Sequence, residues 1–252
     1  MHLLSGGRLR LRRSLYAPQA ARDELMEVPV LCALFKHAQG NVLFDTGCHP
    51  GVAEDAAARW GGLVKVMSPV FAAGDTVIHQ LPSAGLVPGD IDVVVCSHLH
   101  PDHCGCNGFF PRATLICHAA ELAAARQPDA RQRYGYLRED WDTGAKIEAV
   151  DGQRDLFGDG RLTLLPAPGH TPCMLIARAA LDREGVFLLA SDAAPLAEVL
   201  AQRQAPRNSW DAPLALAALE EIARQQSAGA QVIYGHDEAQ WRSIRKGAAF
   251  FD

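Results

Sequence analysis

The segment "SHLHPDHCGCN", residues 97–107, constrains the fold more than any other part of the sequence. Three histidines and one aspartate stand almost side by side, directly after the apolar run "IDVVV". Histidine and carboxylate side chains are seldom buried without partners, because taking polar groups out of water is costly. We therefore expect the strand to deliver this cluster to a place where the side chains bind something. The residues of the cluster are His98, His100, Asp102 and His103.

The spacing of this cluster indicates more than one metal ion. His98 and His100 are two positions apart, so on an extended chain their side chains point to the same side. Pro101 disfavours helical angles at His100, so the segment reads as a strand end that runs into a loop. Asp102 and His103 are adjacent and point away from that pair. One ion could not easily bind all four side chains, but two could if other segments complete each set.

Three further segments repeat the pattern of an apolar strand followed by a single ligand-type residue. "LTLLPAPGH" ends in His170, "VFLLASD" in Asp192 and "VIYGH" in His236. Ligands collected from several strand ends at one edge are a common way for an α/β scaffold to build a site. The combined set of five histidines and two aspartates offers only nitrogen and oxygen donors. It suits two zinc-like ions, and other divalent metals stay open.

Short apolar runs alternate with helical patterns along the whole chain, which is typical of sheets covered by helices. The clearest helix has Asp211 as its N-cap and Pro213 in its first turn. The alternating Leu and Arg residues of "GRLRLRR", residues 7–13, predict a half-exposed strand. The other predicted strands are 28–35, 41–45, 92–97, 113–117, 162–166, 173–178, 186–191 and 231–235, and the predicted helices are 52–60, 76–85, 118–126, 212–227 and 239–249.

Composition excludes several classes of protein. A net charge of −5 without a basic stripe argues against nucleic-acid binding. The longest apolar stretches are far shorter than the ~20 residues of a membrane helix, and no signal peptide is recognisable. Seven cysteines, an odd number without a regular spacing, indicate reduced thiols. We therefore expect a cytoplasmic protein that acts on neither nucleic acid nor membrane.

The motifs "HLHPDH", "PGH", "SD" and "GHD", in this order and spacing, resemble the metallo-β-lactamase superfamily, whose "DTG" also occurs as Asp45-Thr46-Gly47. Within it, "VLFDTG", "GLVPGDIDVVVCSHLHPDH" and "YGHD" resemble the N-acyl-homoserine lactonases and the related pyridoxolactonases. The resemblance covers residues 28–250. It implies an α/β fold, a four-layer αβ/βα sandwich with a dinuclear metal site at one edge, in a single hydrolase domain over residues 1–252.

The resemblance also implies two Zn²⁺ ions per chain and a role for each ligand. One ion would be bound by His98, His100 and His170, the other by Asp102, His103 and His236, with Asp192 as a bridge. Asp45 would orient a ligand from behind, or else cap a turn before Gly47. No role is expected for the remaining histidines, which are His2, His37, His49, His79 and His118.

Such a site predicts hydrolysis of an acyl bond. The hydroxide formed from a water between the two ions is the expected nucleophile, and no "GxSxG" motif offers a serine instead. Asp102 is expected to accept the proton and pass it to the leaving group. The resemblance favours a lactone substrate, such as an N-acyl-homoserine lactone. The apolar segment 63–73 could cover its acyl chain or could be ordinary core, and a homodimer stays open.

Two other classes of function share these residues. The same site could serve another hydrolase: a glyoxalase II-like thioesterase, an arylesterase or an organophosphate hydrolase. A non-hydrolytic oxygen-binding or regulatory protein would favour iron and usually carries an attached flavin domain, for which the chain that ends at Asp252 leaves no room.

The sequence departs from the resembled family at three places. The resembled family has a tyrosine three residues after the bridging aspartate, and this chain has Pro195 there. Either Tyr134 or Tyr136 takes the place of that tyrosine, or the metals act alone. We favour the metals, because the segment with Tyr134 and Tyr136 has no clear site pattern. Cys104 and Cys106 replace small residues, and we expect them to fill space rather than to bind metal. Cys173 and Met174 replace Gly-His, which we expect to make the wall of the site less polar.

Overall fold

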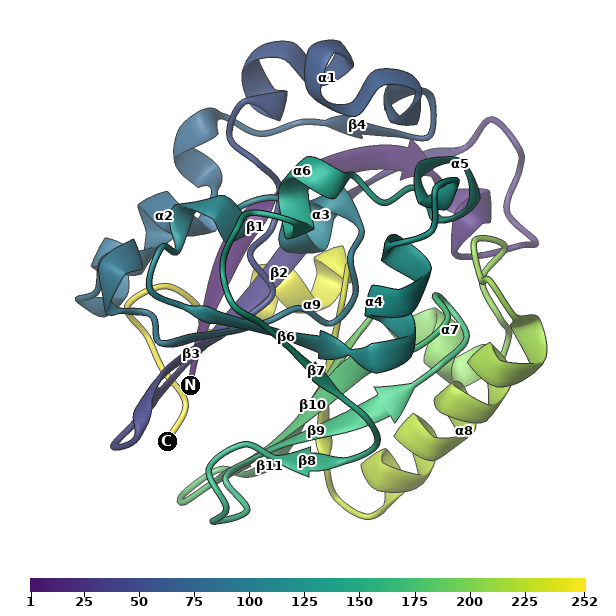
Figure 1. Ribbon diagram of the computed structural model, residues 1–252. Helices are drawn as coiled ribbons and strands as arrows, with labels where there is room; N and C mark the ends of the chain where they lie inside the picture. The colour runs from purple at the N-terminus through teal and green to yellow at the C-terminus, as the bar shows by residue number, and fades with distance from the viewer.

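Two β-sheets pack face to face in the computed structural model, which describes residues 1–252 (Figure 1). The larger sheet has the order β4 (Met67–Pro69), β1 (His2–Arg12), β2 (Leu25–His37), β3 (Gly40–Phe44), β5 (Val93–Val95), β6 (Thr114–His118) and β7 (Ile147–Val150). The smaller sheet has the order β12 (Gln231–Tyr234), β11 (Gly185–Ser191), β10 (Met174–Leu181), β9 (Leu162–Ala167) and β8 (Arg154–Asp155).

The directions of the strands bring several carboxyl ends to one edge. β3, β5, β6 and β7 are mutually parallel in the larger sheet. In the smaller sheet β11 and β12 are parallel, and β9 runs in the same direction as β11 because each is antiparallel to β10. The amide of Leu175 donates to the carbonyl of Ser97 at 2.7 Å, which joins the two sheets next to that edge.

Three apolar clusters separate the layers. The cluster between the sheets includes Phe44, Ile116 and Phe187. On the outer face of the smaller sheet, Leu219 and Ile222 of α8 (Ala212–Ser227) join a second cluster. A third cluster lies on the outer face of the larger sheet, beneath helices that include α2 (Val77–Gln80) and α4 (Ala119–Ala125). The predicted four-layer sandwich is confirmed. The remaining α-helices are α1 (Val52–Trp60), α3 (Pro101–Cys104), α5 (Ala130–Tyr134), α6 (Arg138–Trp141), α7 (Ala197–Gln202) and α9 (Glu238–Ser243).

The predicted strands are all present, most of them with small shifts at their ends, but β1 begins at His2, well before the predicted strand 7–13. Asp211 caps α8 by accepting from the Leu214 amide at 2.9 Å. The predicted helix 239–249 is too long: it ends at Ser243, because Ile244 is already extended, with φ −77° and ψ +147°. The chain then bonds to the start of β1 through the Gly247 amide. The short strands β4, β7 and β8 were not predicted. None of the helices combines the length and the apolarity that crossing a bilayer requires.

Candidate metal centre

The seven predicted ligands converge at the shared edge of the two sheets. His98 and His100 follow β5, and Asp102 and His103 lie in the single turn of α3. The other three follow β9, β11 and β12 in turn, and all seven are buried except His100, which is partly exposed. The last three are His170, Asp192 and His236.

Three histidines form the first group of potential ligands. The His98 Nε2 and His100 Nδ1 atoms are 2.9 Å apart, and the His170 Nε2 atom lies 3.1 Å from the same His100 nitrogen. One nitrogen from each ring lies within 4.8 Å of the other two, a spacing at which one ion can contact all three. These are the residues expected to share one metal.

Asp102, His103 and His236 form the second group, with ligand atoms also within 4.8 Å of one another. The Asp102 Oδ2 atom is 3.5 Å from His103 Nε2 and 3.9 Å from His236 Nε2. Asp192 lies between the groups. Its Oδ2 atom is 3.2 Å from His170 Nε2, whereas its Oδ1 atom is 3.2 Å from His103 Nε2 and 2.9 Å from His236 Nε2. One carboxylate thus presents an oxygen to each group.

The outer nitrogen of three of these rings is held by an oxygen of the protein. His100 Nε2 donates to the carbonyl of Tyr134 at 2.7 Å, and His236 Nδ1 donates to the carbonyl of Pro29 at 2.8 Å. His103 Nδ1 donates to Asp45 Oδ2 at 2.8 Å. Because a carbonyl or carboxylate only accepts, the proton of each neutral ring is on the outer nitrogen, and the inner nitrogen carries a lone pair. Outer partners of this kind commonly orient metal-binding histidines.

The ligand atoms that face one another at the centre would repel each other unless a cation were bound between them. His103 Nε2, His236 Nε2 and Asp192 Oδ1 are buried without a hydrogen-bond partner. A histidine lone pair facing a carboxylate oxygen at about 3 Å is repulsive unless positive charge lies between them. Burial lowers the pKa of His103, but Asp102, Asp192 and Asp45 outweigh it and hold that pKa well above its usual value. Burial lowers the pKa of His170 to about 3, which keeps that ring in the neutral form that binds metal.

Asp45 lies behind the centre and contacts the end of β5. Its carboxylate accepts from the Ser97 amide at 2.6 Å and from the Ser97 hydroxyl at 2.8 Å, in addition to His103. Asp45 has a φ of +60°, a left-handed conformation that is costly for a non-glycine residue. The carboxylate makes no contact within the turn before Gly47, so the geometry supports the orienting role rather than the turn cap.

Two motif glycines are required by close approach of the backbone. A Cβ atom on Gly47 would lie 2.4 Å from the Cα atom of Gly6, at the bulge of β1. A Cβ atom on Gly169 would lie 2.3 Å from the backbone nitrogen of Ala215 in the first turn of α8. Both glycines also have positive φ, which disfavours any other residue. These contacts fix the loops that carry Asp45 and His170.

A cavity of about 300 Å³ opens onto the centre. His100, Asp102, His170 and Asp192 form its polar side. Its apolar lining includes three residues of the segment 63–73. Of the two roles expected for this segment, a cover of the site or ordinary core, the lining agrees with the first. Four more come from the N-terminal part of the chain, and sequence reasoning missed them. These apolar residues are Leu63, Val66 and Met67, and Leu9, Leu11, Leu15 and Tyr16.

Only one of the two candidate tyrosines reaches this cavity. Tyr136 is buried and its hydroxyl donates to Glu121 Oε1 at 2.6 Å, so it is not available to a substrate. Tyr134 lines the cavity and stacks on Tyr136, with ring centroids 5.3 Å apart. Pro195 offers its backbone carbonyl to the His236 amide at 2.9 Å.

All seven cysteines are free, in line with the predicted reduced thiols, and the structure also buries all seven. Cys106 donates a weak hydrogen bond to the carbonyl of Cys48 at 3.1 Å, and burial holds the pKa of the Cys104 thiol well above its usual value. Neither sulfur belongs to a potential ligand group, which agrees with a packing role. Cys173 and Met174 do not line the cavity, so the expectation that they make its wall less polar is wrong: both side chains are turned into the core.

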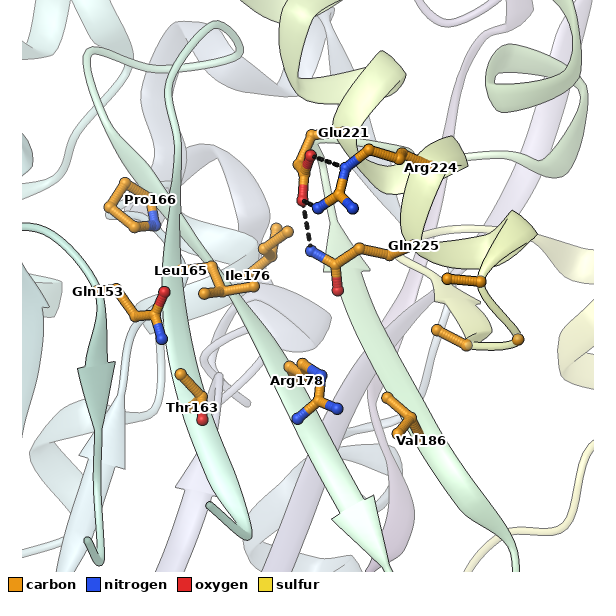
Figure 2. Close-up of a pocket in the computed structure, with 13 residues that line it drawn as sticks. Gln153, Thr163, Leu165, Pro166, Ile176, Arg178, Val186, Glu221, Arg224 and Gln225 are labelled. Carbon is orange, nitrogen blue, oxygen red and sulfur yellow. Dashed lines mark hydrogen bonds and ion pairs between the residues drawn. The ribbon is translucent and has the colours of Figure 1, made fainter.

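A larger cavity of about 600 Å³ lies between α8 and the outer face of the smaller sheet (Figure 2). Glu221 is its only acidic residue, and Arg224 and Gln225 already bond that carboxylate. It contains no histidine or cysteine. The larger cavity therefore lacks metal-binding residues, and only the smaller of these two cavities is lined by the potential ligands.

Comparison with known proteins agrees with this geometry. The family model described as the metallo-beta-lactamase superfamily matches residues 25–236. The N-acyl homoserine lactonase AttM of Azorhizobium caulinodans is 32% identical over 100% of this chain and 98% of its own length. The N-acyl homoserine lactonase AiiB of Agrobacterium fabrum is 30% identical over 91% of this chain and 87% of its own length.

Solved structures extend the similarity to three dimensions. A variant of B. thuringiensis AiiA, with N-decanoyl-L-homoserine bound at its active site, superposes with a TM-score of 0.88 at 25% identity, over 99% of this chain and 98% of that one. An N-acyl homoserine lactone hydrolase with N-hexanoyl-L-homoserine bound at its catalytic metal centre gives the same TM-score, identity and coverage. By sequence, fold and the arrangement of its ligand residues, this chain belongs to the metallo-beta-lactamase superfamily.

Proposed function

We propose that this protein is a zinc-dependent hydrolase that opens the ring of a lactone, with N-acyl-homoserine lactones as the first substrates to test. The observation that carries the proposal is the convergence of seven ligand residues, six of them buried, beside an apolar-walled cavity. The lactonases that match nearly the whole chain support the choice of substrate. Hydrolysis of such signal molecules would make the protein a quorum-quenching enzyme.

The proposed ligand sets follow the two groups of the structure. His98, His100 and His170 would hold one ion, and Asp102, His103 and His236 would hold the other. Asp192 would serve both, since each of its oxygens faces one group. When bound, two divalent ions polarise a carbonyl oxygen and lower the pKa of water towards ~7. Nitrogen and oxygen donors suit zinc, although the count and identity of the ions belong to the proposal.

Asp102 is the proposed catalytic residue. Its side chain lines the cavity and is otherwise buried, so its carboxylate can reach both a water and a bound ester. It would accept a proton from the attacking water as the new carbon–oxygen bond forms. It would return that proton to the alkoxide oxygen as the ring bond breaks, which gives the free hydroxy acid.

The apolar wall suits an acyl chain. The lining of the cavity includes the apolar residues Leu9, Leu11, Leu63, Val66 and Met67 in addition to the ligands. A fatty acyl group buried there would gain roughly 0.8 kcal/mol for each methylene removed from water. The polar head of the substrate would then lie against His100 and Asp102. The wall therefore favours an acylated lactone over a small polar ester.

A substrate panel on zinc-loaded protein tests the proposal. N-acyl-homoserine lactones, simple lactones, thioesters, aryl esters and phosphotriesters are compared by kcat/KM, with a metal-free sample as control. We expect the acylated lactones to rank first and the rate to increase with chain length. A protein that prefers thioesters, aryl esters or phosphotriesters would be one of the other hydrolases that share this site.

The proposal also covers location and assembly. Seven free cysteines suit a reducing compartment such as the cytoplasm. The exposed side chains of Trp210, Leu214 and Leu216, at the start of α8, offer apolar surface for a homodimer. Fractionation of cells tests the location, and sedimentation of the zinc-loaded protein tests the dimer.

A further inference from the structure

Tyr16 occupies a place in the site that no ligand motif marks. It follows the 3₁₀ turn Arg13–Leu15, just beyond β1, and lines the cavity together with Asp102 and Asp192. Only 4% of its surface is exposed. Its ring stacks on the imidazole of His236, with centroids 5.6 Å apart and planes tilted by 12°. The phenol is therefore held in a fixed position next to the candidate metal centre.

The hydroxyl of Tyr16 makes no hydrogen bond to the protein, although the residue as a whole is buried. Its oxygen is not one of the fully enclosed polar atoms that lack a partner, so it keeps contact with open space. Tyr136, the other buried tyrosine, donates to Glu121. Tyr234, on β12, accepts from Gln226 Nε2 at 3.4 Å. Tyr16 packs in the core cluster that also contains Leu219 and Ile222, and it also lines the cavity, so an oxygen of a bound molecule can satisfy its hydroxyl. This cavity is the one in which the ester group would be bound.

We propose that the Tyr16 hydroxyl donates a hydrogen bond to an oxygen of the substrate's ester group, and to the corresponding oxygen of the ring-opened product. The inference rests on the proposed function and adds a residue to it. Only a hydrogen bond is formed: the phenol keeps its proton, and the proton of the reaction passes through Asp102 as described above. A fixed donor aimed at an oxygen that gains negative charge stabilises the transition state more than the bound substrate.

Tyr16→Phe tests the inference, because phenylalanine keeps the stacking on His236 and removes only the hydroxyl. We expect kcat on the best lactone to fall about 10²-fold, with a smaller change in KM and with unchanged metal content. Independently of turnover, calorimetry should show that an N-acyl-homoserine, the ring-opened product, binds zinc-loaded Tyr16→Phe roughly tenfold more weakly than the parent. Tyr234→Phe, which removes a phenol oxygen outside the cavity, is the matched control and should change neither value.

The outcomes separate this inference from the proposed function. A parent protein that hydrolyses neither lactone nor ester overturns both. An active parent whose Tyr16→Phe variant keeps turnover and product affinity within threefold overturns the inference alone. Loss of metal from Tyr16→Phe would also overturn it, since the residue would then support His236 instead of contacting substrate. A large fall in kcat and in product affinity at constant metal content supports it.

Discussion

The two sheets supply their potential ligands in different ways. The larger sheet provides four of them from one loop, residues 98–103, whose neighbours Asp45 and Ser97 bond to each other and to two of its histidines. The smaller sheet provides His170, Asp192 and His236, one from the end of each of three strands. The loop therefore depends on a few local hydrogen bonds, whereas the second set depends on the pairing of a whole sheet. We call the ligands from residues 98–103, with Asp45 and Ser97, the loop half of the centre, and His170, Asp192 and His236 the sheet half. Substitutions in the two halves should have different consequences.

Removal of metal should have the largest effect, because it acts on both halves. Protein purified without chelator is expected to contain about two metal ions per chain, and dialysis against a chelator should abolish hydrolysis. Elemental analysis gives the count, and restoration by zinc is the control. A reproducible content near one or zero, with activity retained, would contradict the two-ion proposal.

Asp192→Asn should come next, because this carboxylate is the contact between the halves. Loss of one charged oxygen should remove at least one ion and lower kcat/KM by at least about a hundredfold. The fold should survive, as circular dichroism would show. Asp23→Asn, at an exposed position, is the control. Full activity with two ions in Asp192→Asn would mean that another residue bridges them.

Asp45→Asn should affect the loop half more gently. The amide keeps one acceptor for Ser97 but loses the charge opposite His103. We expect metal affinity, measured by competition with a chelator, to weaken by roughly 10–100-fold. Asp159→Asn, an exposed aspartate that pairs with His37, provides the control. If the metal affinity of Asp45→Asn is unchanged, Asp45 does not orient a metal ligand and has only a structural role.

Cys104→Ala and Cys106→Ala should leave the loop half intact. If both thiols only fill space, each variant keeps full metal content and loses less than about tenfold in rate, or ~1.4 kcal/mol of barrier. Cys117→Ala reports the effect of deleting a buried sulfur elsewhere in the same core. The loss of an ion from either loop variant would identify a thiolate ligand.

Tyr134→Phe and Tyr136→Phe should have the smallest effect on turnover. Tyr134 bonds to His100 through its backbone carbonyl, which Phe keeps, and the Tyr136 hydroxyl is bound to Glu121, so both variants should stay within a few-fold of the parent. Tyr136→Phe should instead lower the free energy of unfolding by about 1–3 kcal/mol, because Glu121 loses a buried donor. A hundredfold loss of turnover in either variant, at constant metal content, would show that the phenol acts on the substrate.

The difference between the halves also explains what the sequence could predict. The four-ligand loop is visible because its pattern is local, and the single ligands are visible because each ends an apolar strand. The family and the fold were predicted and are confirmed. The roles of the individual ligands stay predictions that the geometry supports.

The wall of the cavity could not be predicted in this way. Leu15 and Tyr16 reach the site only because the chain after β1 turns back over the cavity, and no spacing in the sequence encodes that turn. The alternation in "GRLRLRR" did indicate that Leu9 and Leu11 share a buried face, but not what that face covers. Strand β8 was missed because it is only two residues long.

The proposed metal ligands and most of the apolar wall lie in separate stretches of the chain. Every proposed ligand lies at or beyond residue 98, whereas most of the apolar wall comes from residues 9–16 and 63–67. An enzyme built in this way can exchange its first 70 or so residues for those of a relative without altering a single ligand. Gene chimeras that join foreign N-terminal segments to this C-terminal part should therefore change acyl-chain preference first and metal chemistry last. Such a division would let descendants acquire new substrates through mutations that leave every proposed metal ligand untouched, provided that Tyr16 and Asp45 are kept.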